Sequence, residues 1–250
     1  MKTYNKKFFN SLLMARKSAE AIITELSHYI KPKTIVDVGG GVGVFLSEYK
    51  RKGAREVLNI DGDWVPENLL QIDKNSFLRH DLTKPLSIKK RYDLAICLEV
   101  GEHLDKRYSY TLVKTITSLS DVVLFSAAIP GQGGTHHVNE QWPQYWAVKF
   151  EKFGFVPIDI LRYKLWDNDK IEVFYRQNIF VYVKKDKLNG YKKLKNAYKD
   201  NKKVLSIVHP VLYNIVSDYK TIPINRIIRG VTYLPKRTLK HITKNTSRAD

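Results

Sequence analysis

The stretch Thr34-Ile-Val-Asp-Val-Gly-Gly-Gly-Val-Gly-Val44 decides the fold of this 250-residue chain. Its first part, 34–38, is a short β-branched run that glycines interrupt at once, so it predicts a buried strand rather than a helix. After the glycine turn, apolar residues recur at helical spacing over 44–49. A strand, a glycine turn and a helix in this order are typical of a nucleotide-type site, because the backbone can approach a ligand closely and unpaired helix amides face it.

A carboxylate stands immediately before the turn. Asp37 lies at the end of the predicted strand, where it suits a ligand with an ammonium group better than one with phosphates. No Lys-Ser/Thr pair follows the glycines, which excludes a Walker phosphate loop. The Asp-x-Gly-x-Gly-x-Gly pattern from Asp37 to Gly43 resembles the motif of class I S-adenosylmethionine-dependent methyltransferases.

Strand and helix signals alternate along the rest of the chain. Further strands are predicted at 55–60, 76–80, 92–98, 122–127, 155–161 and 171–183. This order predicts an α/β fold with a Rossmann-like, doubly wound, mostly parallel seven-stranded sheet and an antiparallel edge hairpin. We expect the class I methyltransferase domain over 30–184, preceded by an N-terminal amphipathic helix or lid at 1–29. A basic C-terminal extension, helical or partly disordered, is expected over 185–250.

Acidic residues follow three of the later strands, at the strand ends where open α/β sheets bind their ligands. An NAD-dependent dehydrogenase could share the sheet and a ribose-binding acid. It ranks lower, because the third glycine falls too early for a dinucleotide turn and no Tyr-x-x-x-Lys set is evident. By the resemblance, the S-adenosylmethionine site comprises Asp37, Gly39 and Gly41 at the methionine end with Gly43 in the same turn, Asp61 at the ribose, Asp81 and Leu82 at the adenine, and Glu99 beside the methionine portion or the substrate.

Histidines are the candidates for acceptor chemistry. Methyl transfer from a sulfonium is an in-line displacement that needs alignment, with a general base if the nucleophile is a hydroxyl. Histidine titrates closest to neutral pH. His103 follows the fourth strand, and its alternative role is to cap or pack against the next helix. His136 and His137 lie in a glycine-rich loop that can close over substrate. We expect His137 or His103 to accept the proton and Glu140 to orient the acceptor.

The segment 130–146 resembles the loop and helix of methyltransferases from glycan and surface-polysaccharide pathways, which show Gly-Gly, then His-Val-Asn-Glu-Gln, then Tyr-Trp. On that match His137 is the family histidine, while His136 stands where a small residue is more common, so the base assignment stays open. Aromatic rings suit sugar faces, and polar side chains bind hydroxyls. The alternative is that the aromatic residues, Trp146 among them, only fasten the helix to the sheet. The substrate-binding candidates are His136, Asn139, Gln141, Trp142 and Tyr145.

These features predict methyl transfer to a sugar hydroxyl of a small-molecule or glycan acceptor, in a glycan or nucleotide-sugar pathway. An RNA or small-metabolite methyltransferase and a non-catalytic adaptor acting through its basic tail are the alternatives. The Asn/Asp-Pro-Pro-aromatic motif of amino-group methylation is absent after the fourth strand, which reads Leu98-Glu-Val-Gly. No metal site is expected, because the side chains of His136 and His137 diverge on an extended backbone and no acidic partner is positioned by the sequence.

Charge is unevenly distributed in the chain, whose net charge is +18. The extension 185–250 holds 16 Lys and Arg against 4 Asp and no Glu, so most of that charge lies there. This charge indicates either a lysine-rich face exposed to solvent or a surface for peripheral contact with an anionic membrane or with glycan-assembly enzymes. Nucleic acid ranks last as a partner. A single cysteine, Cys97, and the lack of a run of ~20 apolar residues predict a cytoplasmic protein, with a membrane-peripheral location as the alternative.

Overall fold

The computed structural model describes residues 15–200 and 205–217. The chain divides into two compact units, 1–212 and 213–250. The second unit is described only as far as Ser217, where the last helix ends. Apart from this helix, which crosses the boundary between the units, the described helices and strands belong to the first unit. In the described ranges, no helix combines the length and the apolar character needed to cross a membrane.

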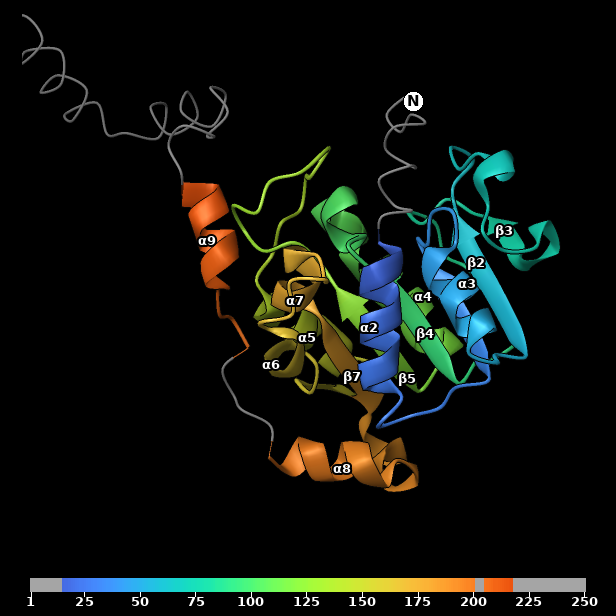
Figure 1. Ribbon diagram of the computed structural model, residues 1–250. Helices are drawn as coiled ribbons and strands as arrows, with labels where there is room; N and C mark the ends of the chain where they lie inside the picture. Colours follow the sequence, from blue (N-terminus) through green and yellow to red (C-terminus); the bar gives the residue numbers. More distant parts are fainter. Residues whose placement is uncertain (1–14, 201–204, 218–250) are drawn as a thin grey trace, which may run out of the picture. The chain divides into compact units, whose positions relative to one another are not determined.

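One seven-stranded sheet forms the centre of the first unit, with strand order β3-β2-β1-β4-β5-β7-β6 (Figure 1). Strand β7 is antiparallel to both β5 and β6, and the other pairs are parallel. This arrangement confirms the predicted Rossmann-like sheet with an antiparallel edge. The strands are β1 (Thr34–Val38), β2 (Glu56–Asp61), β3 (Phe77–Arg79), β4 (Leu94–Leu98), β5 (Val122–Ser126), β6 (Phe155–Ile158) and β7 (Phe180–Lys184).

Helices cover both faces of the sheet. Neighbouring residues of a strand divide between two apolar clusters: Ile35 and Ile96 belong to one, Val36 and Cys97 to the other. Burial on both faces explains why these strands are apolar throughout rather than alternating. The first cluster includes residues of α2, α3, α7 and α8, and the second those of α4 and α5. The helices are α2 (Arg16–Leu26), α3 (Val44–Arg51), α4 (Ser109–Leu119), α5 (Pro143–Glu151), α6 (Arg162–Leu165), α7 (Val173–Asn178), α8 (Lys192–Lys199) and α9 (Pro210–Ser217).

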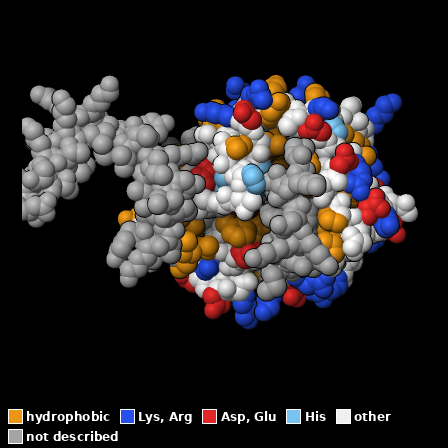
Figure 2. Space-filling view, turned by 90° about the horizontal axis from the view of Figure 1, so that it is seen from above, with side chains coloured by type: hydrophobic (Ala, Val, Ile, Leu, Met, Phe, Trp, Pro, Cys, Tyr) orange, Lys and Arg blue, Asp and Glu red, His pale blue; other side chains and the backbone are white. Residues whose placement is uncertain are grey.

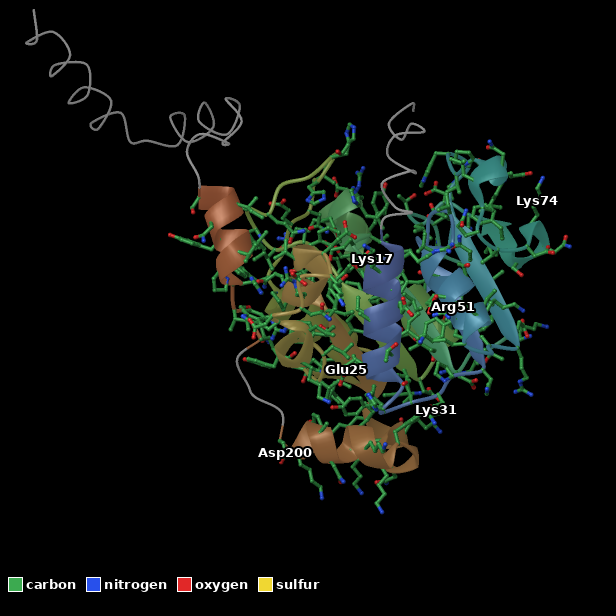
Figure 3. The ribbon with its side chains drawn as sticks, viewed as in Figure 1. Lys17, Glu25, Lys31, Arg51, Lys74 and Asp200 are labelled. Atoms are coloured by element: carbon green, nitrogen blue, oxygen red, sulfur yellow. The ribbon has the colours of Figure 1, made fainter. Side chains whose placement is uncertain are left out.

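Helix α2 is the described part of the predicted N-terminal amphipathic helix, and it lies beside α3 in front of the sheet (Figure 1). Its apolar face is buried, and its polar face is tied to the domain by ion pairs. Arg51 of α3 pairs with Glu20 at 3.0 Å, and Lys164 pairs with Glu25 at 2.6 Å. Figure 3 labels Arg51 and Glu25, one member of each pair. The earlier part of the predicted helix, with its phenylalanine and leucine pairs before Ala15, lies outside the described residues.

The predicted strand 171–183 is wrong in its first half. Residues Val173–Asn178 form helix α7, and β7 begins only at Phe180. The β-branched and aromatic residues there favour a strand locally, but packing decides the conformation. The ring of Tyr175 is buried and lies edge-on to Phe45 of α3 at 5.6 Å. The predicted strand 155–161 likewise ends early, at Ile158, where the chain turns into α6.

The first part of the basic extension packs on the domain. After the short 3₁₀ segment Lys185–Gly190, helix α8 buries Leu194 in the first apolar cluster. Further on, Arg162 donates a hydrogen bond to the carbonyl of Leu205, and Gln177 donates one to the carbonyl of Ile207. Residues 205–209 are therefore held by α6 and α7.

Candidate functional site

A cleft of about 1020 Å³ opens at the carboxyl ends of the parallel strands. Figure 2 views this face, on which histidine side chains lie beside a recess with apolar groups. The volume accommodates a cofactor and a small acceptor together. A small hollow next to it includes Asp37. The predicted site residues that line the main cleft are Gly39, Gly41, Asp61, Asp81, Leu82, Glu99, His103, His136 and His137.

The glycine turn forms one wall of the cleft, and it lacks side chains that would keep a ligand away from the backbone. Gly39, Gly41 and Gly43 all have positive φ, and Gly43 is the N-cap residue directly before α3. A Cβ on Gly39 would lie 2.5 Å from a methyl group of Val100, so no larger residue fits there. Asn59 donates to the carbonyl of Gly41 at 2.8 Å and so holds the turn against β2. The backbone is fixed where a ligand can contact it directly.

Asp61 supports the same turn from the end of β2. Its carboxylate accepts hydrogen bonds from the amides of Gly41 (2.8 Å) and Gly62 (2.7 Å) and from the indole of Trp64. Burial raises the pKa of Asp61 to about 6, although these hydrogen bonds act in the opposite direction. These three donors leave about one acceptor position of the carboxylate for a further donor, such as a ribose hydroxyl.

Asp37 lies deeper than Asp61, and only 3% of it is exposed. Burial, and next the charge of Asp61, raise the pKa of Asp37 to about 7. A positive charge nearby would favour its ionised form. The hollow therefore has a carboxyl that an ammonium group could pair with, and that it holds one stays a prediction.

The predicted adenine residues lie at the β3 edge of the cleft. Asp81 is half-exposed, and it accepts hydrogen bonds from the Thr83 hydroxyl (2.6 Å) and amide (3.0 Å), which lower its pKa. Leu82 is buried beside it. The turn is thus rigid before any ligand arrives.

Glu99 follows β4 in a left-handed conformation, with φ of 53°, which is uncommon for a residue other than glycine. Its carboxylate accepts hydrogen bonds from Asn178 at 3.1 and 3.3 Å and from Gln132 at 3.1 Å. Burial raises the pKa of Glu99. The amide partners come from α7 and from the loop after β5, so Glu99 joins three separate parts of the cleft wall.

Glu102, His103 and His137 form a cluster at the other end of the cleft. One ligand atom from each lies within 4.8 Å of the other two, and the histidine rings are nearly perpendicular with centroids 4.9 Å apart. Burial, and next the charge of Glu99, raise the pKa of Glu102 well above its ordinary value. Burial, and next His137, lower the pKa of His103 to about 4. An acidic partner for the histidines, which we did not expect from the sequence, is therefore present.

Glu140 orients His137 rather than facing the cleft. Its carboxylate lies 3.0 Å from His137 Nδ1 and accepts the amides of Gly131 and Gly133 at 2.7 Å each. Burial acts to raise the pKa of Glu140, but the hydrogen bonds from His137 and the two glycines outweigh it and lower that pKa. One carboxylate thus fixes both the loop and the histidine ring.

Comparison with known proteins identifies the family. Residues 13–169 match the family model described as a methyltransferase domain. The chain belongs to this methyltransferase family. The match confirms the predicted resemblance to class I S-adenosylmethionine-dependent methyltransferases, and it gives no support to the glycan-pathway part of that prediction. A comparison with curated protein sequences gives no match.

Solved structures confirm the fold. The human N-acetylserotonin methyltransferase, in complex with SAM, is 15% identical with a TM-score of 0.50; the alignment covers 72% of this chain and 56% of that one. A putative O-methyltransferase from Nostoc punctiforme is 16% identical with a TM-score of 0.52, covering 68% and 57%. An O-methyltransferase family protein from Burkholderia thailandensis is 11% identical with a TM-score of 0.53, covering 71% and 58%. The match thus spans a little over half the length of these three proteins.

Four of the predicted substrate residues of this methyltransferase lie outside the cleft lining. Asn139 is buried and donates to the Gly101 carbonyl and the Ser109 hydroxyl, both at 3.1 Å. Tyr145 donates to the same hydroxyl at 3.0 Å. Gln141 donates to Asn139, and Trp142 is exposed. These contacts, like the fully buried Trp146, fasten the loop and α5 to the 3₁₀ turn Gly101–His103 (η3) and to α4.

Several cleft residues were missed by sequence reasoning. The aromatic ring of Trp64 covers Gly62, whose Cβ would lie 2.3 Å from it. Its place directly after Asp61-Gly62-Asp63 is the one signal that could have pointed to it. Glu102 stands directly before His103 and three residues after Glu99, and this local group after β4 is the signal that could have pointed to it. Gln132 and Asn178, whose amides bind Glu99, carry no local signal, because these contacts join segments far apart in the chain.

Proposed function

We propose that the chain is an S-adenosylmethionine-dependent O-methyltransferase that modifies a hydroxyl group. The observation that carries the proposal is one cleft with two chemically distinct ends. One end has the glycine turn and Asp61, with Asp37 in the small hollow beside it, and the other has His137, which Glu140 holds. A cofactor site and a histidine suited to accept a proton thus face the same space.

The residues of the first end fit the cofactor. Asp37 is a buried carboxyl next to a hollow, which suits the ammonium group of the methionine portion. There is no room for a Cβ at Gly39, and without one the ligand can lie directly against the backbone amides of the turn. Asp61 accepts a hydrogen bond from a ribose hydroxyl, while Asp81 and Leu82 contact the adenine. Trp64 lies over this part of the site.

The second end supplies the proton acceptor. Glu140 accepts the proton of His137 Nδ1, which leaves the lone pair of the ring on Nε2. His137 Nε2 takes the proton of the acceptor hydroxyl as its oxygen attacks. Bound S-adenosylmethionine supplies the methyl carbon, to which the acceptor oxygen bonds as the carbon–sulfur bond breaks and S-adenosylhomocysteine is formed. His103 packs against His137 and keeps its ring in place.

The loop after β5 bears on the class of acceptor through its resemblance to loops of other methyltransferases. We propose a sugar hydroxyl as the first candidate, on the resemblance of 130–146 to loops of glycan-pathway enzymes. The aromatic residues of α5 do not face the cleft, so a sugar ring would lie against Phe174 or Tyr175, which do line it.

Tritium transfer from methyl-labelled S-adenosylmethionine to a panel of sugars and nucleotide sugars tests the proposal. We expect Asp61→Ala to abolish binding of S-adenosylhomocysteine. His137→Ala should leave that binding intact and lower turnover by about 10²-fold or more, the usual contribution of a general base. Equal loss of cofactor affinity in both variants would remove His137 from the catalytic role. Cofactor binding without transfer to any hydroxyl acceptor would favour a non-catalytic adaptor.

A further inference from the structure

The cluster of Glu102, His103 and His137 has the composition and spacing of a metal site. Each residue offers one ligand atom, and these atoms all lie within 4.8 Å of one another. Ligands around an ion with bonds of about 2.1 Å stand roughly 3 Å apart, so modest side-chain rotations bring all three into contact with one ion. Two of the ligands come from η3 and the third from the loop after β5.

A second observation points to a cation at this place. Glu102 is 0% exposed, and in the part of the chain described its carboxylate oxygens make no hydrogen bond of normal length and angle. The polar groups around them are the carboxyl of Glu99 and the backbone of Glu102 and Ala128, so two acidic side chains share one buried space with no described cationic side chain beside them. Buried carboxylates in proteins are paired with a positive group or coordinate a metal. The described Lys and Arg side chains that line the cleft pair elsewhere, Arg79 with Glu67 and Lys84 with Asp81.

The surroundings of His137 match those of a metal ligand. Ligating histidines almost always donate their second ring N–H to a carboxylate or a carbonyl, which fixes the tautomer and the ring orientation. Glu140 accepts from Nδ1 at 3.0 Å and is itself held by the amides of Gly131 and Gly133. The lone pair of His137 is thus on Nε2, the nitrogen that would bind an ion.

We propose that Glu102, His103 and His137 bind one divalent metal ion, whose open coordination positions take the hydroxyl of the methyl acceptor. Two imidazoles and one carboxylate suit Mn²⁺, Fe²⁺, Co²⁺ or Zn²⁺ better than Mg²⁺ or Ca²⁺, which prefer oxygen ligands alone. The role for the acceptor rests on the proposed function, whereas the ion site itself does not. With the ion bound, His137 is a ligand instead of a base. The ion acidifies the bound hydroxyl, and its proton passes to bulk water through the open cleft.

Calorimetric titration of Mn²⁺ into the full chain, stripped with EDTA, tests the site without using activity. We expect one ion per chain, and at least tenfold weaker binding in Glu102→Gln, His103→Gln and His137→Gln. His136→Asn is the matched control: it removes the neighbouring histidine of the same loop, and asparagine tolerates the left-handed conformation at that position, where φ is 58°. This variant should bind Mn²⁺ like the unmodified chain.

Binding of S-adenosylhomocysteine is the control for folding. A variant that binds it is folded, because the substituted residues do not belong to the cofactor end of the cleft. Absence of Mn²⁺ and Zn²⁺ binding, or binding that the three ligand variants leave unchanged, would overturn the proposal. Hydroxyl methylation that survives EDTA with full turnover would exclude the ion from the reaction while leaving the proposed function standing. Specific ion binding without methylation of any hydroxyl would support the site and count against the proposed function instead.

Discussion

Replacing Asp37 with Asn should stabilise the fold and weaken the cofactor site at once. Burial raises the pKa of the Asp37 carboxyl from 3.8 to about 7. Because the pKa of Asp37 is higher in the folded than in the unfolded chain, its protonation favours the folded state. This contribution to the free energy of unfolding is fully present below about pH 4 and is lost as the pH rises through about 7. At about 1.4 kcal/mol per pKa unit, the loss in the free energy of unfolding reaches roughly 4 kcal/mol.

The variant Asp37→Asn carries no charge and escapes this loss. Burying the amide takes back part of the gain, so we expect the variant to be more stable by about 2 kcal/mol at pH 8, or roughly 5 °C in Tm. At pH 5 the unfolded carboxyl is ionised and the folded one is not, so only about 1.2 of the roughly 3.2 pKa units of loss are present, or roughly 2 kcal/mol. The cost of burying the amide offsets this amount, so the difference should nearly disappear. Thermal melts between pH 5 and pH 8 measure it. A difference in Tm that does not change with pH would refute the assignment of a buried, pH-dependent charge to Asp37.

The same variant should bind S-adenosylhomocysteine at least tenfold more weakly, because the ammonium group of the ligand loses its carboxylate partner. Melts with and without the ligand show this as a smaller ligand-induced rise in Tm than in the unmodified chain. An equal rise in both proteins would place the methionine end of the cofactor elsewhere.

Three further substitutions test other parts of the account. Gly134→Ala would put a Cβ 2.3 Å from His137 Nε2, so turnover should fall at least tenfold while calorimetry shows unchanged S-adenosylhomocysteine affinity; loss of both would mean a general collapse of the loop. Trp64→Phe keeps a ring over Gly62 but removes the indole N–H that donates to Asp61, so it should weaken the affinity for S-adenosylhomocysteine several-fold. An unchanged dissociation constant in calorimetry would contradict this. Arg162→Met removes the guanidinium that pairs with the buried carboxylate of Asp159 and should cost about 3 kcal/mol in denaturant unfolding; a loss below about 1 kcal/mol would contradict the buried pair.

Local patterns predicted the elements that build the glycine-turn end of the cleft, while the cofactor roles of the residues there stay a prediction. The strand before Asp37, the glycine turn and the acid after β2 are each encoded by a few adjacent residues, and the parallel sheet places them at one edge. The helix α7 was missed because Val173, Phe174 and Tyr175 favour strands locally, while packing against α3 selects the helix.

The acceptor end was only partly predictable. His103 and His137 were recognised as candidates one by one, but their contact depends on how the loop after β5 folds back over η3. The amides of Val138 and Asn139 donate to the carbonyl of Glu102 at 2.8 and 3.0 Å, and these bonds bring the loop there. No spacing in the sequence encodes that return. The same bonds turn Asn139 inward, which explains why this predicted substrate residue binds Gly101 and Ser109 instead of lining the cleft.

Calorimetric titration of the full chain with S-adenosylhomocysteine, with NAD as the control ligand, tests the central claim most directly. The account predicts one molecule of S-adenosylhomocysteine bound per chain with micromolar affinity, no binding of NAD, and loss of the signal in Asp61→Ala. Binding of NAD, or of neither ligand, would contradict the assignment of the glycine turn and its two acids to a methyltransferase cofactor site.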